Sequence, residues 1–504
     1  MRRVLFFVYL DTHFVELSRL ALLLKGVGGW ECVFQFVYRY PARPRDLEFC
    51  RQHGFLAVDG AGNLMGPESE SPLAPGSSDG KPRQSRWTRL RQLARQPGRA
   101  RLRTIAAAFL SQFRRASPSG FLQALMFPRF SVFLAICLEH QKQANSAMEK
   151  LRPHLLVLPE DNVAYPTGAL IRAAKELGAP SLIVPYTIAN AEEIAEAYWD
   201  NPDYWLTRWR NRVVGWLYPA WIHTHKERRL LPLPPDQILA IEHLGLAPPH
   251  PWVINSGAAD CLAVESPFML RYYLAAGLPR GRMVVTGALA DDVLFRRMAG
   301  SSSGAPAARF PERPMRRPIL LCALPPDQFR SRRRAAEFDS YEALVRAWAA
   351  ELAAARAFDV VVRLHPRTLK EDVPYLENEY GLAVSTEDTA TLVAGCDVFL
   401  ASVSATIRMA IAAGKPVINY DCYRYRYSDF IDVPGLITVT DREAFRAALA
   451  RLADVRAREE LAARQREFAA KEFPLDGRSG ERVLALVDTL LTERRAPDPS
   501  PDRV

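Results

Sequence analysis

A histidine and an arginine lie at the end of a predicted apolar strand in the second half of the chain. Residues 360–364 form this strand, which contains Arg363, and His365 and Pro366 follow it. Parallel α/β sheets bind ligands at the carboxyl ends of their strands, and proline turns the chain away, so we expect His365 at the mouth of a cleft. An imidazole N–H or a guanidinium there can bind a phosphate oxygen. A histidine that only caps a neighbouring loop is the structural alternative.

Three hydroxyl side chains follow the next predicted strand, at residues 397–400. They are Ser402, Ser404 and Thr406, at the start of a helix predicted over 404–413. Hydroxyls cap the exposed N–H groups at a helix start, and the same groups favour a phosphate together with the positive end of the helix dipole. Capping alone explains one hydroxyl, whereas three at alternating positions indicate a phosphate-binding turn.

A second group of candidates surrounds the end of the strand predicted at 416–420. Asn419 and Asp421 lie there, and tyrosine alternates with arginine from 423 to 427, where Arg424 is the first arginine. Tyrosine and arginine line sugar and phosphate pockets by stacking and bidentate contacts, but the same alternation is typical of an amphipathic edge. Asn419, Asp421 and Arg424 are therefore secondary candidates.

Acidic side chains follow a predicted strand of the first half, at 155–158. Glu160 and Asp161 come after this strand, and Asn162 comes next. Adjacent carboxylates raise each other's pKa, which suits a general base that takes a proton from a hydroxyl. A turn that begins the next helix is the structural alternative. Glu193, which follows a second apolar strand, is a weaker candidate of the same kind.

The sequence predicts no metal site and no other cofactor. His223 and His225 lack a third ligand at a usable spacing, and no Asp-x-Asp pair follows a predicted strand. The seven cysteines are scattered, with no Cys-x-x-Cys pair, and several lie in apolar runs. We therefore expect free, buried thiols in a cytoplasmic protein.

Composition and charge narrow the functional class. With 504 residues, 49% of them hydrophobic and 24% charged, the chain is typical of a globular protein. Residues 81–115 contain eleven Lys or Arg and no acid. Because nothing resembling a nucleic-acid module accompanies them, we expect no nucleic-acid partner. Peripheral contact with an anionic membrane, worth about 1 kcal/mol for each basic residue, and a solvated insertion are equal alternatives.

Apolar strands alternate with helices in two series, which predicts two doubly wound α/β domains with parallel sheets. The apolar run at 4–10 is too short to span a membrane and predicts a buried first strand. A ligand cleft should lie between the domains, at the carboxyl ends of the strands. The predicted parts are an N-terminal domain at 1–297 with a flexible basic insertion at 60–118, a linker at 298–317, a C-terminal domain at 318–490 and a disordered tail at 491–504.

Three motifs together resemble a known family. The His-Pro turn at 363–366, the serine turn at 402–406 and the segment AIAAGKPVINYD at 410–421 are similar to those of bacterial GT-B glycosyltransferases of capsule and lipopolysaccharide synthesis. The pattern is most like the polysialyltransferase, sialyltransferase and Kdo-transferase groups. The resemblance implies the GT-B fold, in which two Rossmann-like domains face a central cleft and helices close the C-terminus. It covers residues 150–490.

The same resemblance implies a reaction and assigns roles. The expected reaction is inverting, metal-independent transfer of a sugar from a nucleotide-activated donor to a glycan or lipid-linked acceptor. By matching motif, Glu160 or Asp161 would be the base, and His365, Ser402 and Ser404 would contact the donor. Asn162 departs from the family pattern, which has glycine at that position. The expected location is the cytoplasm, peripheral on the inner face of the inner membrane.

Other enzymes of the same fold remain alternatives. Segments 285–294 and 473–483 resemble UDP-GlcNAc 2-epimerase-like and CDP-glycerol glycerophosphotransferase proteins, and Gly287 in the first segment is a further candidate. An epimerase or hydrolase would need no acceptor, and His13 and Glu265 would then be the residues of interest. A polyol phosphotransferase and a non-catalytic nucleotide-binding protein are the remaining alternatives.

Overall fold

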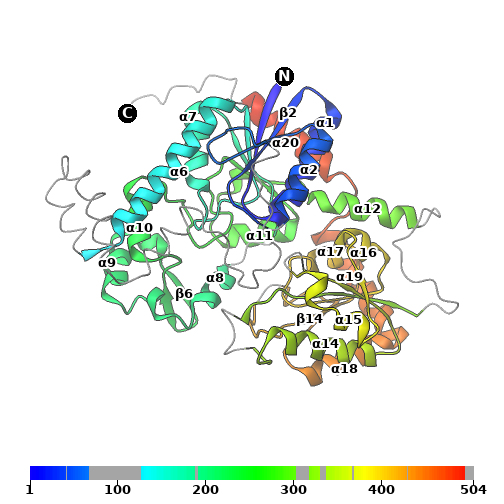
Figure 1. Cartoon of the computed structure of the whole chain (residues 1–504). Coiled ribbons are helices and arrows are strands. Elements are labelled where there is room, and N and C mark those ends of the chain that lie inside the picture. The colour runs from blue at the N-terminus through cyan, green and yellow to red at the C-terminus, as the bar shows by residue number, and fades with distance from the viewer. Residues whose placement is uncertain are drawn as a thin grey trace, which may run out of the picture.

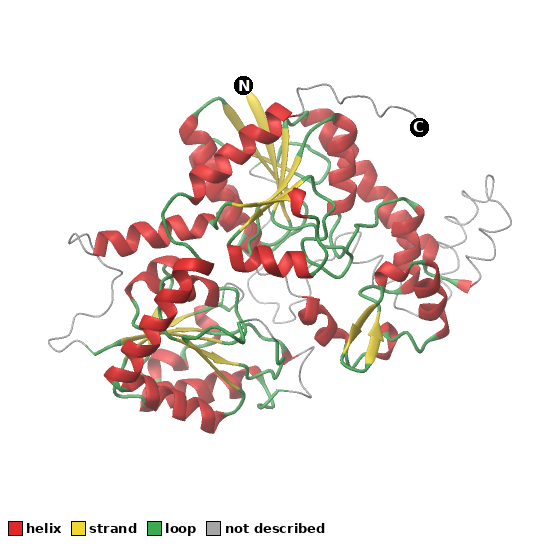
Figure 2. Cartoon of the chain, turned by 180° about the vertical axis from the view of Figure 1, so that it is seen from behind, coloured by secondary structure: helices red, strands yellow, loops and turns green. Residues whose placement is uncertain are grey.

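The computed structural model describes residues 1–40, 42–66, 126–187, 191–301, 317–329, 336–365, 368–427 and 430–493. These residues form two α/β lobes, and each lobe is built on a parallel sheet with helices on both faces (Figures 1 and 2). The predicted pair of doubly wound domains is confirmed. The basic stretch at 81–115 lies outside the described residues, as does all of the predicted insertion beyond residue 66.

The first lobe contains a seven-stranded sheet in the order β3-β2-β1-β4-β5-β8-β9. Its strands are β1 (Arg2–Val8), β2 (Trp30–Phe36), β3 (Leu56–Val58), β4 (Leu155–Leu158), β5 (Ser181–Ile183), β8 (Cys261–Val264) and β9 (Met283–Val285). All neighbouring pairs are parallel, and Val4 of β1 is in register with Cys32 of β2 and with Leu155 of β4. The strand order reverses between β1 and β4, and doubly wound sheets open a ligand crevice at such a point.

Side chains of β1 alternate between two hydrophobic cores. Val4 and Phe6 pack toward α1 (Asp11–Val27), α2 (Arg43–His53) and α20 (Ser479–Glu493). Leu5 and Phe7 pack toward α6 (Phe130–Leu151), α7 (Thr167–Leu177) and α11 (Pro267–Ala275). The unbroken apolar run therefore forms a strand that is buried on both faces, as the sequence predicts.

A small subdomain lies between β5 and β8 in the chain. It consists of α8 (Ala191–Tyr198), α9 (Trp209–Leu217), α10 (Pro235–His243) and an antiparallel hairpin of β6 (His223–His225) and β7 (Arg228–Leu230). Trp221 is fully buried there, in a cluster that also includes Phe130 at the start of α6. Figure 1 shows α9 and α10 beside the start of α6, at the end of the first lobe away from the second lobe. Within the described ranges, no helix has both the length and the apolar character to cross a membrane.

The second lobe contains a six-stranded parallel sheet in the order β12-β11-β10-β13-β14-β15. Leu320 and Cys322 of its central strand pack toward α14 and α18, and Leu321 packs toward α16 and α17. The strands are β10 (Ile319–Ala323), β11 (Asp359–Arg363), β12 (Ala383–Ser385), β13 (Val398–Ala401), β14 (Val417–Tyr420) and β15 (Leu436–Val439). The main helices are α14 (Tyr341–Ala354), α16 (Thr389–Gly395), α17 (Ile407–Ala412), α18 (Arg442–Ala453) and α19 (Val455–Glu472).

Two helices connect the two lobes. Helix α12 (Leu289–Ser301) has Leu289 in a core of the first lobe and Leu294 in a core of the second, and it covers the first residues of the linker predicted at 298–317. Residues 302–316 lie outside the described part. Helix α20 packs Val483 against the first lobe, and it lies at the end of the C-terminal domain predicted at 318–490. Helix α20 runs to Glu493, and the rest of the tail predicted at 491–504 lies outside the described residues.

Candidate functional site

Three strand ends of the first lobe bring a histidine, a glutamate and two tyrosines together. His13 lies in the first turn of α1 after β1, Glu160 follows β4 and Tyr186 follows β5. The Nε2 of His13 is 3.2 Å from the Oε1 of Glu160, and both side chains are buried. The rings of Tyr186 and Tyr165 lie 4.5 Å and 5.9 Å from the imidazole, measured between ring centroids. The His13–Glu160 pair is thus shielded from water at the point where the strand order reverses.

The hydrogen bonding of His13 indicates where its proton lies. The backbone N–H of Tyr9 donates to Nδ1 at 3.4 Å. In a neutral imidazole this leaves the proton on Nε2, next to the carboxylate of Glu160. Within the described residues, neither His13 Nε2 nor Glu160 Oε1 has an aligned hydrogen-bond partner. Since buried polar atoms are normally bonded, the pair has spare capacity for a ligand group, and a hydroxyl fits this need.

Asp161 instead holds a backbone loop. Its carboxylate accepts the backbone N–H groups of Ser256, of Ala258 at 2.8 Å and of Ala259 at 3.3 Å. Burial raises the pKa of Asp161 to about 7, and these N–H groups counteract part of that rise. Because both carboxylate oxygens are engaged and the side chain is 2% exposed, Asp161 has a structural role. Glu160 is therefore the better candidate for a base.

Asn162 organises the turn that leads into α7. Its Oδ1 accepts the backbone N–H of Ala164 at 2.9 Å, and its carbonyl accepts the hydroxyl of Thr167 at 3.2 Å. These contacts are the ones expected of a turn residue, the structural alternative from the sequence. They explain why an asparagine stands at this position.

Glu193 lies exposed on α8, while a different acid of the same helix is buried. Glu196 is 3% exposed, and its Oε1 lies 2.8 Å from the Nε2 of His225. Burial lowers the pKa of the neighbouring His223, and His225 adds to this effect. Over the residues that the structure describes, no three or more His, Cys, Asp or Glu side chains group so as to hold a metal ion. The contact between Glu196 and His225 joins α8 to the β6–β7 hairpin.

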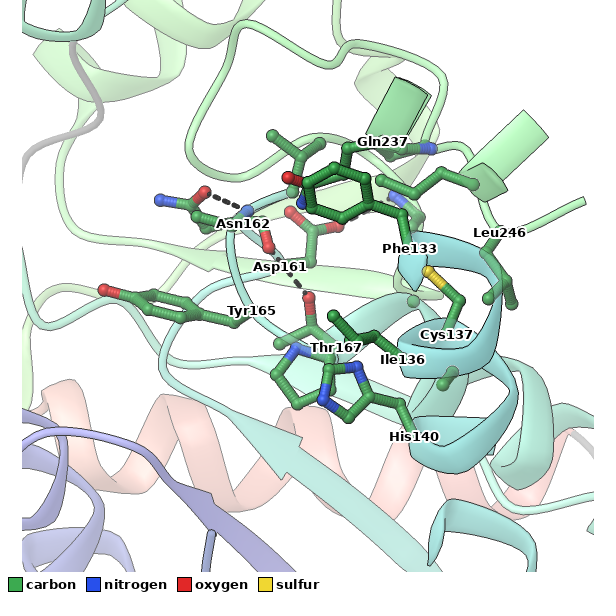
Figure 3. Close-up of a pocket in the computed structure, with 18 residues that line it drawn as sticks. Phe133, Ile136, Cys137, His140, Asp161, Asn162, Tyr165, Thr167, Gln237 and Leu246 are labelled. Atoms are coloured by element: carbon green, nitrogen blue, oxygen red, sulfur yellow. Dashed lines mark hydrogen bonds between the residues drawn. The ribbon is translucent and has the colours of Figure 1, made fainter. Parts of the chain in front are cut away.

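A pocket adjoins the His13–Glu160 pair. It lies between α6, α10 and the turn at 161–167, with about 720 Å³ of empty space, open solvent included (Figure 3). Apolar side chains such as Phe133 and Leu246 form much of its lining, and His140 of α6 is a polar member. Tyr165 borders the pocket and also contacts the imidazole of His13. Tyr165 thus links the lining of the pocket to the buried pair.

Buried charges join the two lobes near the end of β8. Burial raises the pKa of Glu265, which follows β8, to about 7, and the positive charge of Arg408 partly opposes this. Arg408 of α17 donates to both carboxylate oxygens of Asp291 of α12, at 2.9 Å and 2.7 Å. The signal in the sequence was a single arginine inside an apolar helix, since a charge in such a run needs a partner. The identity of that partner was not readable from the sequence.

One face of α1 extends from the buried pair to the second lobe. His13, Glu16 and Arg19 recur at intervals of three residues, so they form a row along the helix. Arg19 is paired with Glu16 and reaches Asp388, which precedes α16, at 3.0 Å. The row that begins at His13 therefore ends at a residue of the second lobe. The His13–Glu160 pair thus lies on the side of the first lobe that faces the second.

The His-Pro turn lies at the end of β11, as predicted. Arg363 is half-buried and donates to the carbonyl of Leu364 at 2.8 Å, while its Nε has no partner in the described part. Burial lowers the pKa of Arg363, and the negative charge of Asp388 opposes this. His365 is half-buried, and its carbonyl accepts the N–H of Thr368 at 2.8 Å. Pro366 lies outside the described residues.

The three hydroxyls of the serine turn differ in their surroundings. Ser404 and Thr406 are half-buried, and their hydroxyl oxygens are 2.8 Å apart. Ser402 is 5% exposed, and its hydroxyl lies against the sulfur of Cys422 at 3.3 Å. The helix expected over 404–413 is only Ile407–Ala412, so its dipole is small. Ser404 and Thr406 therefore remain candidates for donor binding, whereas Ser402 points into the fold.

Asn419 supports the serine turn from the neighbouring strand. Its Oδ1 accepts the backbone N–H of Val403 at 2.9 Å. Val403 has a φ of 43°, which is rare for a β-branched residue and needs support from its surroundings. Asn419 thus supports the backbone of the serine turn and is a positioning residue.

Asp421 and Arg424 belong to a loop with alternating burial. The Asp421 carboxylate accepts the backbone N–H groups of Tyr425 at 2.9 Å and of Arg426 at 2.6 Å. Tyr423 and Tyr425 are buried in a core of the second lobe, and Arg424 is exposed. The alternation is thus that of an amphipathic edge, which was one of the two interpretations of the sequence.

Gly287 marks the place where the C-terminal helix crosses the first lobe. Its φ is +83°, and a Cβ atom would collide with the hydroxyl of Ser479. Nearby, Asp292 accepts the backbone N–H of Ser479 at 2.9 Å and caps the start of α20. Gly287 therefore has a packing role here, because only a glycine allows this approach.

Comparisons with known proteins bear on the fold. No family model and no curated protein matches the sequence. Among solved structures, CalG4, the calicheamicin glycosyltransferase, is 14% identical with a TM-score of 0.50, and the match covers 98% of each chain. S. aureus MnaA in complex with UDP is 11% identical with a TM-score of 0.50, covering 98% of this chain and 97% of that one.

This chain has the GT-B fold. The two parallel sheets covered by helices fit that arrangement. The fold expected from the sequence motifs is confirmed. At 11% to 14% identity the likeness concerns the fold alone, so activity has to be argued from the residues of the site.

Proposed function

We propose that this protein is a glycosyltransferase of bacterial surface polysaccharide synthesis. It would move a sugar from a nucleotide-activated donor to a glycan or lipid-linked acceptor, with inversion and without a metal ion, as the capsule and lipopolysaccharide groups that its motifs resemble do. The observation that carries the proposal is the buried His13–Glu160 pair, which has spare hydrogen-bonding capacity on the side of the first lobe that faces the second.

In this reaction Glu160 accepts the proton of the acceptor hydroxyl. The acceptor oxygen then bonds to the anomeric carbon of the donor sugar, the bond from that carbon to the phosphate oxygen breaks, and the nucleotide leaves. The Nε2 of His13 lies 3.2 Å from the Glu160 carboxylate and would hold it in position for the acceptor hydroxyl. Low local polarity makes this contact stronger than it would be in water.

The donor phosphates would be bound by the second lobe. The hydroxyls of Ser404 and Thr406 are half-buried and adjacent. Arg363 and His365 lie at the end of β11, and its strand is separated from β13, which leads into the serine turn, only by β10. Hydroxyl, imidazole and guanidinium groups are common phosphate ligands. The positive charge of Arg363 would also stabilise the leaving nucleotide.

The test uses the full chain with UDP-, GDP-, CMP- and CDP-linked donors. A thermal-shift screen identifies the donor, since binding at a thousand times Kd stabilises by about 4 kcal/mol. With that donor, Glu160→Gln should abolish sugar transfer and keep the thermal shift, whereas Ser404→Ala with Thr406→Val should reduce the shift. Asn162→Gly, at a turn position with no proposed substrate contact, is the control. Wild-type turnover by Glu160→Gln would refute this assignment of the base.

An epimerase or hydrolase that acts on a sugar nucleotide is the second candidate. The buried Glu265, whose Oε2 has no partner in the described part, favours it as an additional acid. The likeness to S. aureus MnaA concerns only the fold. Product analysis without any acceptor separates the two candidates, because only the second would epimerise or hydrolyse the donor alone. CDP-glycerol in the same donor series tests polyol-phosphate transfer.

The proposed place of action is the cytoplasmic face of the inner membrane. The eleven basic residues between 81 and 115, with no acid among them, support this part of the proposal. Anionic lipids attract such a stretch by about 1 kcal/mol for each basic residue. Binding of the protein to anionic vesicles that weakens steeply with added salt would support the assignment, and equal binding to neutral vesicles would contradict it.

A further inference from the structure

Helix α9 exposes large apolar side chains along one face. Trp209 is 53% exposed, Trp216 is 81% exposed and Leu217 is 47% exposed. Positions seven residues apart lie on the same face of a helix, so the two tryptophans are in line, with the exposed Arg212 between them. We call Trp209, Arg212, Trp216 and Leu217 the α9 face. Figure 1 shows α9 at the outer end of the first lobe, away from the second lobe.

The opposite side of α9 fixes the helix to the protein. Val214 is fully buried, and the side-chain amide of Asn211 donates to the carbonyls of Asp203 at 2.9 Å and of Trp205 at 2.8 Å. The tryptophans are therefore not core residues of a displaced helix. They are presented to the outside by a helix that is anchored on its other side.

The segment of sequence that contains the α9 face is basic. Residues 204–221 contain three arginines and no acid. The nearest acid in the sequence, Asp203, is paired with Arg208 at 3.0 Å, and the guanidinium of Arg210 lies 5.2 Å from the ring centroid of Trp209. Tryptophan is enriched at the level of lipid headgroups, where its ring is half apolar and half hydrated. Arginine in the same place is neutralised by anionic lipid.

A neighbouring segment of the chain adds to this polarity. The ring of Phe127, just before α6, lies 6.2 Å from the ring of Trp209. In the sequence, the basic stretch at 81–115 comes shortly before Phe127. The most basic part of the chain is thus connected covalently to the edge of the α9 face. This continuity favours an extended anionic surface as the partner.

We propose that the α9 face docks on the surface of a bilayer that contains anionic lipid. The helix would lie in the plane of the headgroups, with the two tryptophans and Leu217 inserted and Arg212 among the phosphates. Such a shallow position is typical of amphipathic helices that combine tryptophan and arginine. This docking goes beyond sugar transfer and does not depend on it.

The test is co-sedimentation of the full chain with vesicles of phosphatidylcholine, with and without 30% phosphatidylglycerol, taken as roughly the anionic share of a membrane surface. Trp216→Ala with Leu217→Ala should weaken binding to the anionic vesicles about tenfold or more, and Arg212→Gln about fivefold. Ile431→Ala, which removes a 75% exposed apolar side chain from the second lobe, is the matched control and should bind as the wild type does. All these side chains are exposed, so an unchanged melting temperature should accompany each variant.

Two measurements separate docking through the α9 face from binding through another surface and from self-association. Trp216→Phe should keep vesicle binding but lose part of the fluorescence quenching by brominated acyl chains, because an inserted tryptophan has been removed. If Trp216→Ala with Leu217→Ala binds vesicles as the wild type does, the α9 face is not the contact, even if the stretch at 81–115 is. A dimer in solution that the same double variant dissolves would also overturn the proposal, since the face would then bind a second copy of the chain.

Discussion

Replacement of Asp161 should damage the stability of the first lobe rather than the chemistry. In the native structure its carboxylate accepts three backbone N–H groups, and the side chain is 2% exposed. Asp161→Ala leaves these buried donors without a partner, at about 1–3 kcal/mol each. Because the loop at 256–259 can relax, the three costs do not add fully, and we expect a loss of about 3–5 kcal/mol in the free energy of unfolding.

The assay is thermal unfolding of the full chain, followed together with turnover of the donor found by screening. For a lobe of this size, a loss of about 3–5 kcal/mol lowers Tm by about 6–20 °C. Asp161→Asn keeps one acceptor oxygen and should cause about half of that loss, on the order of 2 kcal/mol. Glu160→Gln is the matched comparison at the adjacent position, and it should lose turnover while its Tm stays close to that of the wild type.

The opposite pattern would refute this reasoning. If Asp161→Asn melts at the wild-type temperature and has lost turnover, then the N–H contacts of its carboxylate contribute little, and Asp161 is the base. If, in addition, Glu160→Gln is fully active, the buried pair with His13 has no part in the reaction.

Three further predictions concern the contacts between and within the lobes. Burial raises the pKa of Glu265 from 4.5 to about 7, so the folded protein binds its proton more tightly than the unfolded chain does. Stability should therefore fall by up to about 3 kcal/mol as the pH rises from about 4.5 to 7, and urea titrations of Glu265→Gln should lack this slope. Asp291→Ala leaves the buried Arg408 without its charge partner and should lower the free energy of unfolding in urea by about 3–5 kcal/mol. Adding Arg408→Met to this variant should restore most of that loss. A double variant no more stable than Asp291→Ala would contradict this. Gly287→Ala should lower Tm more than Gly381→Ala, because both glycines have positive φ but only at Gly287 would a Cβ atom collide with another residue, at the Ser479 hydroxyl. Equal losses in Tm would show that α20 does not pack closely against this turn.

Local sequence pattern was sufficient to predict the fold and the strand ends at which several candidate residues lie. Apolar runs such as 155–158 and 360–364 predicted buried parallel strands, and the residues after them were predicted to lie at a ligand-binding edge. The structure places Glu160, Arg363 and His365 at such strand ends. This success has a simple cause, since burial on both faces of a parallel strand leaves a signal in a few consecutive residues.

Local sequence pattern could not show which of two adjacent carboxylates is the better candidate for the base. Glu160 and Asp161 are adjacent and chemically alike, but consecutive side chains in an extended segment point to opposite sides. One meets His13, and the other meets the loop at 256–259, which is about a hundred residues away in the chain. The partner of each carboxylate depends on which strands are neighbours in the sheet, so it is a tertiary property.

The sequence by itself determined two α/β lobes, the strand ends that carry polar residues and the single sign of the charge in the basic stretch at 81–115. Only the tertiary structure decided that His13 joins Glu160, that Arg408 joins Asp291 and that α20 returns to the first lobe. It also decided that the α9 face is exposed. The physical reason is that strand and helix patterns arise from residues that are near neighbours in the sequence. The contacts of His13, Arg408 and α20 join residues more than a hundred positions apart, and the exposure of the α9 face depends on which side of the helix the rest of the lobe covers.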